Sequence, residues 1–185
     1  MITKLSQDDI NMKQTTLFST GTKSPTSGAY FSPDRIYRYV LWRIWDKSKP
    51  AIMFIGLNPS TADESLNDPT ITRCLGFSKS WGYGSLYMLN LFAFRATDPN
   101  DMKSTSMPIG EENLKYLIQY AKTVDQIICA WGNHGSYLNQ SKIILDLFRK
   151  DESLFTKLYY FKLSQKGEPV HPLYQSADSK LTKYN

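Results

Sequence analysis

Residues 51–57 read AIMFIGL, an uninterrupted apolar run. A strand with one face in water alternates apolar and polar residues, whereas a continuous apolar run of this length predicts a strand covered on both faces, as in a parallel sheet. Residues 58–67 follow as a loop, and Asp68-Pro69 then predicts a helix start, because a carboxylate caps free backbone amides and proline suits the first helical position. Residues 51–81 therefore predict a β-loop-α unit.

The alternation of strand and helix continues on both sides of this unit. The sequence predicts further strands at 35–46 (one long strand or a bent pair), 85–91, 126–131 and 157–163, helices at 111–122 and 137–149, and a basic tail at 180–185. This order predicts an α/β fold: a three-layer α/β/α sandwich with a central four-stranded parallel sheet, plus an N-terminal strand or hairpin.

Length and composition indicate one globular domain. A chain of 185 residues with 41% hydrophobic and 21% charged residues fits a domain at 29–185 after a flexible arm at 1–28. No apolar run approaches the roughly 20 residues of a membrane span, and Asp8 and Asp9 stand where a signal peptide is apolar. We expect a cytoplasmic monomer without a membrane partner. Two cysteines and the lack of a Gly-rich phosphate motif predict no metal and no cofactor.

The positive charge is concentrated in the flanks of the chain. The net charge is +5, residues 1–50 hold eight Lys/Arg against four Asp/Glu, and residues 149–185 hold seven against four. Flanks of this kind suit contacts with nucleic-acid phosphates around a central site. Many basic proteins never bind nucleic acid, so the charge favours DNA as a partner without identifying it.

Polar residues follow each of the four predicted parallel strands. They are found in residues 56–61 (GLNPST), at Asn90, in residues 130–135 (AWGNHG) and in residues 167–174 (GEPVHPLY), and the last two segments contain the only two histidines. The carboxyl ends of parallel strands meet at one edge of a sheet, which is where ligands bind in open α/β folds. The sequence therefore predicts a composite polar site at that edge.

Four short motifs at these positions resemble the uracil-DNA glycosylase superfamily. Gly56-Leu57-Asn58-Pro59 resembles the Gly-x-Asn-Pro first motif of the mismatch-specific uracil/thymine glycosylases. Met88-Leu89-Asn90 is similar to the strand-end Leu-Leu-Asn of the classical uracil glycosylases. Trp131-Gly132-Asn133-His134 is similar to their Trp-Gly-Ser-His stretch. His171-Pro172 is similar to the His-Pro that opens their DNA-entering loop. The resemblance implies a glycosylase-like fold.

From about Tyr30 to its end, the chain also resembles an uncharacterised bacterial, archaeal and phage family that is known only as a domain of unknown function. The resemblance rests on residues 37–39, 57–63, 68–71, 90–93 and 171–174. It implies no activity.

The glycosylase resemblance implies a hydrolase that cleaves the N-glycosidic bond of a damaged, mismatched or modified base in DNA. His171 would donate to the base oxygen that gains charge, Asn58 would position water, and Asn90 would read the base edge. Asp63 or Asp68 would supply a carboxylate. The remaining implied residues are Gly56, Pro59, Asn133 and His134 for base binding and Ser60, Arg95, Leu173 and Tyr174 for nucleic-acid binding, the last two as candidates to fill the gap left by a flipped nucleotide.

The sequence departs from the glycosylase pattern in three places. The classical uracil glycosylases have Asp where this chain has Asn58. The loop at 62–68 holds no aromatic residue to stack on a base, and His171-Pro172 is followed by Leu-Tyr-Gln instead of Ser-Pro-Leu. These departures weaken the general-base role and leave the accepted base open.

Each candidate also has a structural explanation. Asp68 is expected to cap a helix, Asn58 to shape a turn before proline, Asn90 to satisfy loop amides, and His134 to hold a loop. The alternative function is a non-catalytic module of the same fold that binds nucleic acid or a nucleotide.

Overall fold

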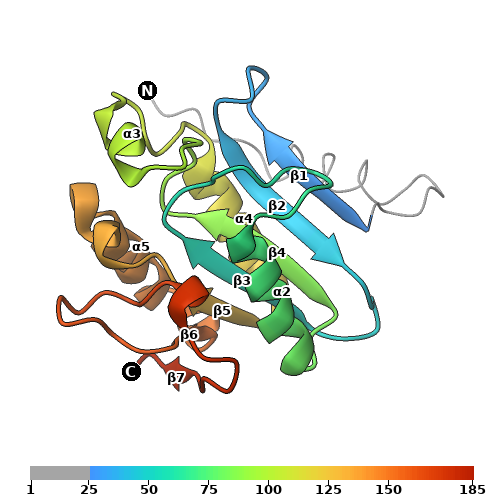
Figure 1. Cartoon of the computed structure of the whole chain (residues 1–185). Coiled ribbons are helices and arrows are strands. Elements are labelled where there is room, and N and C mark those ends of the chain that lie inside the picture. Colours follow the sequence, from blue (N-terminus) through green and yellow to red (C-terminus); the bar gives the residue numbers. More distant parts are fainter. Residues whose placement is uncertain (1–25) are drawn as a thin grey trace, which may run out of the picture.

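The computed structural model describes residues 26–185, and residues 1–25 of the arm expected at 1–28 lie outside them. The strands form a seven-stranded mixed sheet (Figure 1). They are β1 (Ser27–Phe31), β2 (Arg38–Ile44), β3 (Ala51–Gly56), β4 (Ser85–Asn90), β5 (Gln126–Cys129), β6 (Leu158–Tyr160) and β7 (Thr182–Lys183), in the order β1-β2-β4-β3-β5-β6-β7. The pairs β4/β3, β3/β5 and β5/β6 are parallel, and β1, β2 and β7 add antiparallel pairs.

Helices cover both faces of the sheet, as the α/β class predicts. The helix α2 (Pro69–Ser80) lies on one face (Figure 1) and packs through Ile71, Cys74 and Phe77 into one core cluster. The other face is covered by α3 (Pro99–Ser104), α4 (Asn113–Thr123), α5 (Gln140–Arg149) and α6 (Glu152–Phe155), and the 3-10 turns η1 (Asn133–Asn139) and η2 (Pro172–Tyr174) lie in the loops after β5 and β6.

The buried strand β3 explains the apolar run of its sequence. Ile52 and Phe54 pack in the cluster under α2, and Met53 and Ile55 pack in the cluster on the opposite face. All four side chains are fully buried. Burying a side chain of this size stabilises the fold by about 1.5–3 kcal/mol, so a polar residue at any of these positions would be costly.

The start of α2 is determined by its own sequence. The Oδ1 atom of Asp68 accepts a hydrogen bond of 2.8 Å from the backbone N–H of Ile71, and Pro69 occupies the first turn. The cap therefore fixes the point at which the loop after β3 ends and α2 begins.

The sheet has three strands besides the four parallel ones, and two of these, β1 and β2, form an antiparallel pair where an N-terminal strand or hairpin was expected. Ser27 and Gly28, expected at the end of the arm, pair with Arg43 and Trp42 in β1 and β2. The expected basic tail contains the two-residue strand β7, whose residues pair with β6. These edge strands are short and depend on pairing with neighbours far away in sequence, which leaves little local signal.

The helix expected at 137–149 begins three residues later. Leu138 and Asn139 have φ values of 51° and 55°, the left-handed conformation, and this breaks the chain between η1 and α5. A left-handed residue cannot continue a right-handed helix, so α5 starts at Gln140. In the part of the chain that the structure describes, no helix has the length and apolar character needed to cross a membrane.

Candidate functional site

The carboxyl ends of β4, β3, β5 and β6 lie at the same edge of the sheet because these strands are parallel. Only β3 separates β4 from β5, so the ends of β4 and β5 are about 10 Å apart, two strand spacings. The segments after these strands carry the polar residues that the sequence singled out.

Asn90, at the end of β4, is 1% exposed. Its Nδ2 and Oδ1 atoms are both buried, and neither has a hydrogen-bond partner among residues 26–185. Oδ1 lies against Gly56 at the end of β3, where an added Cβ would come within 2.8 Å of it. Leaving a buried polar group unpaired costs about 1–3 kcal/mol, so this amide opposes folding and is suited to a ligand that pairs with it.

Asn113, which the sequence analysis missed, holds the backbone at the same strand end. Its Nδ2 atom donates to the carbonyl oxygens of Asn90 and Leu91, at 3.0 Å each. Asn113 is fully buried at the start of α4. A polar residue within an amphipathic helix was the available signal, but its partners lie 22 and 23 residues away and cannot be identified from the sequence.

His171 enters the site from the loop after β6. Its Nδ1 atom accepts a hydrogen bond of 3.3 Å from the backbone N–H of Leu173, so the proton of the neutral ring lies on Nε2. Burial lowers the pKa of His171, and the nearby Asp68 carboxylate opposes this shift. A Cβ added to Gly132, just beyond β5, would lie 3.8 Å from the His171 Cβ. The imidazole is therefore neutral at pH 7 and lies beside the ends of β5 and α2.

The Asp68 carboxylate raises the pKa values of two basic groups. Its charge acts on His171 and on Arg38, a residue of β2 that is 2% exposed. Burial lowers the pKa of Arg38 to about 10, Asp68 raises it, and the neighbouring Arg95 and Arg43 lower it. The Oδ1 atom of Asp68 caps α2, and the structure gives Oδ2 no hydrogen bond within its described residues. The structural role of Asp68 thus leaves one carboxylate oxygen for a ligand.

Two of the proposed catalytic side chains hydrogen-bond with nearby backbone. The Nδ2 atom of Asn58 donates to the carbonyl oxygens of Ala96, at 2.7 Å, and Pro59, at 3.1 Å. The Oδ1 atom of Asp63 accepts from the backbone N–H groups of Ser65 and Leu66, and these bonds lower the pKa of Asp63. Asn58 keeps its acceptor oxygen for water, whereas Asp63 organises its own loop.

Arginines of β2 hold the loop at 62–67, a role that the sequence analysis did not assign. Arg38 donates to the Ala62 carbonyl oxygen at 2.8 Å, and Arg43 donates to the carbonyl oxygens of Asp63, Glu64 and Leu66. The buried guanidinium groups thus donate the hydrogen bonds that backbone N–H groups would donate to these carbonyl oxygens in a helix or strand.

The polar residues after β5 make contacts outside this cluster. The Nδ1 atom of His134 lies 2.9 Å from the Lys103 Nζ, and burial, Lys103 and Lys166 all lower the pKa of His134. The Oδ1 atom of Asn133 accepts from the Ser164 Oγ at 2.6 Å. The first contact joins η1 to α3, and the second joins η1 to the loop after β6.

Glu168, another residue that the sequence analysis missed, joins three segments. Its Oε2 atom accepts from the Trp131 indole N–H at 2.6 Å, and its Oε1 atom accepts from the Ser141 Oγ at 2.9 Å. This carboxylate fixes the loop that leads to His171.

Leu173 and Tyr174 protrude from η2. They are 38% and 82% exposed, and the centroids of the Tyr174 and His171 rings are 5.9 Å apart. Pro172, which lies between His171 and Leu173 in the chain, is buried and anchors the turn. The geometry places two large exposed side chains directly beside the histidine.

Ser60 and Arg95 lie in the same pocket. This pocket has a volume of about 450 Å³ and is also lined by Arg35, Thr61 and Thr97. The Ser60 and Thr97 hydroxyl groups are 3.4 Å apart. The bonds that join Ala96 to Asn58 and Pro59 connect the wall of this pocket to the turn after β3.

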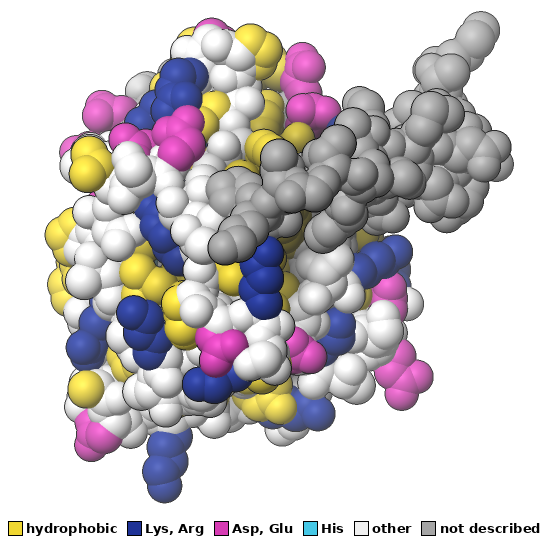
Figure 2. Space-filling view, turned by 90° about the vertical axis from the view of Figure 1, so that its right-hand side faces the viewer, with side chains coloured by type: hydrophobic (Ala, Val, Ile, Leu, Met, Phe, Trp, Pro, Cys, Tyr) yellow, Lys and Arg dark blue, Asp and Glu magenta, His cyan; other side chains and the backbone are white. Residues whose placement is uncertain are grey.

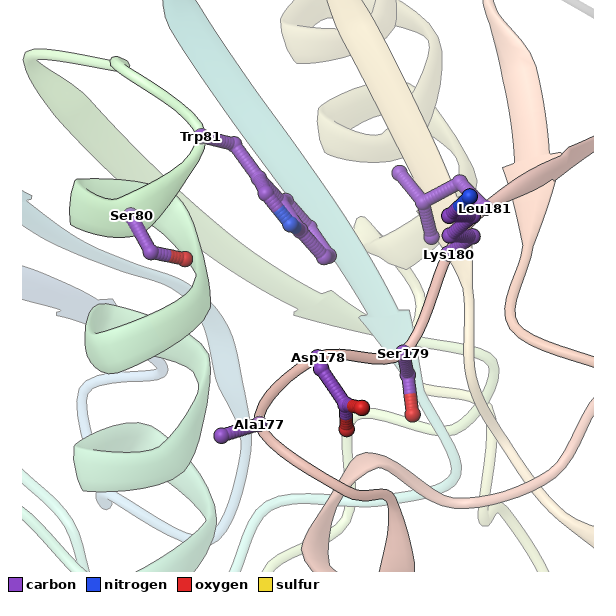
Figure 3. Close-up of a pocket in the computed structure, with 7 residues that line it drawn as sticks. All are labelled: Ser80, Trp81, Ala177, Asp178, Ser179, Lys180 and Leu181. Carbon is purple, nitrogen blue, oxygen red and sulfur yellow. The ribbon is translucent and has the colours of Figure 1, made fainter.

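A second pocket, of about 410 Å³, lies at the opposite end of α2, between Trp81 and residues 177–181 (Figure 3). The Trp81 indole points into the space between the helix and the C-terminal segment (Figure 3). A 12-residue helix is about 18 Å long, so this pocket is separate from the site at Asp68.

Figure 2 shows the right-hand side of Figure 1, on the side of β1 and β2, where Lys and Arg side chains are interspersed with Asp and Glu on the visible part and no histidine is seen. The basic excess of the chain does not form a continuous patch on that surface.

Comparisons with known proteins give one match. No curated protein matches the chain, and no solved structure does. The comparisons give no link to the uracil-DNA glycosylases, so that resemblance stays a prediction. A family model described as protein of unknown function (DUF1643) matches residues 38–173. This range runs from the start of β2 into η2, leaves out β1 and β7, and contains the strand ends described above. The chain therefore belongs to the DUF1643 family of proteins of unknown function.

Proposed function

We propose that this protein is a glycosylase-like hydrolase that breaks the N-glycosidic bond of a base in DNA. The observation that carries the proposal is the Asn90 amide, which is buried at the end of β4 with both polar atoms unpaired. An amide donates and accepts at once, as recognition of a base edge requires. Because both atoms are enclosed, the base reaches them only after the side chains that cover them move.

The strand order supports the same reading. The parallel strands β4, β3, β5 and β6 bring the four motifs of the glycosylase resemblance to one edge of the sheet. Helices on both faces give the three-layer arrangement that this resemblance implies.

His171 and Asp68 would carry the chemistry. In the hydrolysis, a bond forms between a water oxygen and the sugar carbon, the glycosidic bond breaks, and the base leaves with the electron pair. The Nε2–H of His171 would stabilise the charge on the leaving base, and Asp68 would stabilise the cationic sugar and accept the proton of water. The exposed Tyr174 beside His171 would fill the space of a flipped nucleotide.

The experiment is release of free base from oligonucleotides that carry uracil, 5-hydroxymethyluracil, mismatched thymine or a modified cytosine. Wild type should release one of these bases, and His171→Gln should slow the release by about 10²-fold or more, the usual contribution of such a donor. The matched control is Arg149→Gln on α5, an exposed residue paired with Asp146. Release at the wild-type rate by His171→Gln would contradict the assignment.

A second candidate function is a binding module without hydrolysis. It is favoured by the bonds of Asn58 and Asp63, since backbone groups occupy the Nδ2 atom of the first and an oxygen of the second. The same assay decides between the two: retention of base-dependent binding without release of any base would support the module.

A further inference from the structure

The pocket between Arg35, Ser60 and Arg95 lies beside the proposed base site, with its wall on the turn that follows β3. Gly56 at the base site and Ser60 in the pocket are four residues apart, at most about 14 Å along the chain. A nucleotide whose base pairs with Asn90 would therefore place phosphate groups near this pocket.

Arg95 is poised to donate to an anion. No carboxylate among residues 26–185 forms an ion pair with it. Its Nη1 atom donates to the Arg35 carbonyl oxygen at 3.1 Å, and its Nε atom is buried with no hydrogen-bond partner in the described chain. The guanidinium carbons of Arg35 and Arg95 lie 3.9 Å and 4.9 Å from the centroid of the Phe31 ring, which positions both groups.

Hydroxyl groups complete the polar lining. Ser60 and Thr97 approach within 3.4 Å from opposite segments, and Thr61 adds a third hydroxyl. Arginine with hydroxyl donors is a usual combination for phosphate oxygens. The charge of Arg35 is balanced by Glu64 at 2.7 Å, whereas Arg95 lies close enough to Arg38 to lower its pKa. The positive field of the pocket thus comes mainly from Arg95, and the buried Arg38 nearby adds to it.

We propose that this pocket binds a backbone phosphate of single-stranded nucleic acid, with Arg95 as its main ligand. The inference rests on the proposed function and adds the path of the strand, between the turn after β3 and the segment that leads to α3. The shared chemistry is a phosphate group, which a polynucleotide or a free nucleotide can supply.

The test uses an oligonucleotide of abasic sites, which offers phosphates without bases, and measures its affinity for the full chain over a range of salt concentrations. Arg95→Gln should weaken binding about tenfold at low salt, as expected for loss of a charged hydrogen bond. It should also reduce the slope of log K against log salt by about 0.7–1, equivalent to one phosphate. Arg95→Lys should restore the slope, and Arg149→Gln, which removes an equal charge on α5, should leave it unchanged.

Equal slopes for wild type and Arg95→Gln, or equal losses in Arg95→Gln and Arg149→Gln, would overturn the proposal. The same affinity measurement is made with a nucleoside monophosphate and with inorganic phosphate. If binding of these small ligands depends on Arg95 and binding of the abasic oligonucleotide does not, the phosphate in the pocket belongs to a free nucleotide. Asn90→Leu should bind the abasic probe as wild type does. Base release without Arg95-dependent binding would refute this inference alone, and Arg95-dependent binding without release of any base would refute the proposed hydrolysis alone.

Discussion

Replacing Asn90 by Leu should stabilise the protein. The side chain is 1% exposed, and its two polar atoms have no hydrogen-bond partner in the described part of the chain. An unpaired buried amide costs about 1–3 kcal/mol in proteins, and leucine has a similar branched shape without polar atoms. The free energy of unfolding should rise by about 1–3 kcal/mol, and Tm by about 2–4 °C for each kcal/mol in a chain of this size.

The matched control is Asn113→Leu, a second fully buried asparagine. This change removes two hydrogen bonds of 3.0 Å that Asn113 Nδ2 donates, and it leaves the carbonyl oxygens of Asn90 and Leu91 short of a partner. It also removes the Oδ1 atom of Asn113, which is buried without a partner in the described chain, and this offsets part of the loss. The free energy of unfolding should fall by about 1–3 kcal/mol. Urea denaturation followed by circular dichroism measures both variants. A loss of stability in Asn90→Leu as large as that in Asn113→Leu would refute the reasoning, because it would mean that the Asn90 amide is paired in the native state.

Three further predictions concern neighbouring positions. Gly56→Ala should lower the free energy of unfolding by about 1–3 kcal/mol by calorimetry, because the new methyl group would meet Met88 Cε at 2.6 Å and Asn90 Oδ1 at 2.8 Å. It should also weaken base binding, and unchanged binding would show that the Asn90 amide is not the contact. Folding lowers the pKa of His171, so the native protein binds fewer protons than the unfolded protein. The free energy of unfolding should be greatest above about pH 6.5 and fall as the pH drops toward the lowered pKa. Urea titrations at several pH values should show a smaller fall in His171→Gln. Glu168→Ala should lower unfolding free energy by about 2–3 kcal/mol in urea, since the Trp131 indole and Ser141 lose a charged acceptor; a change within about 0.5 kcal/mol would contradict this.

Features that depend on local sequence could be predicted. The apolar run of β3 is buried on both faces, and the cap at Asp68 begins α2 where the Asp-Pro pair indicated. Edge strands such as β7 could not be predicted, because two residues gain strand geometry only from their partners on β6. The break at Leu138 and Asn139 was also missed, since neither residue type requires a left-handed conformation.

The candidate site shows the same division. The strand-end rule placed Gly56 and Asn90 together at one edge, and the structure bears out that they are in contact. The groups that hold the site were not predictable, because Asn113 and Glu168 reach partners more than 20 residues away. Tertiary contacts of this kind leave no periodic signal in the sequence.

The most direct test of the base site is the NMR signal of the Asn90 side-chain amide, assigned by its loss in Asn90→Leu. Titration with free nucleobases should shift this signal and that of the His171 ring, while the side-chain amide of Asn113, already bonded to backbone, stays in place. An unchanged Asn90 signal at saturating concentrations of every base would contradict a base-binding site at this edge of the sheet.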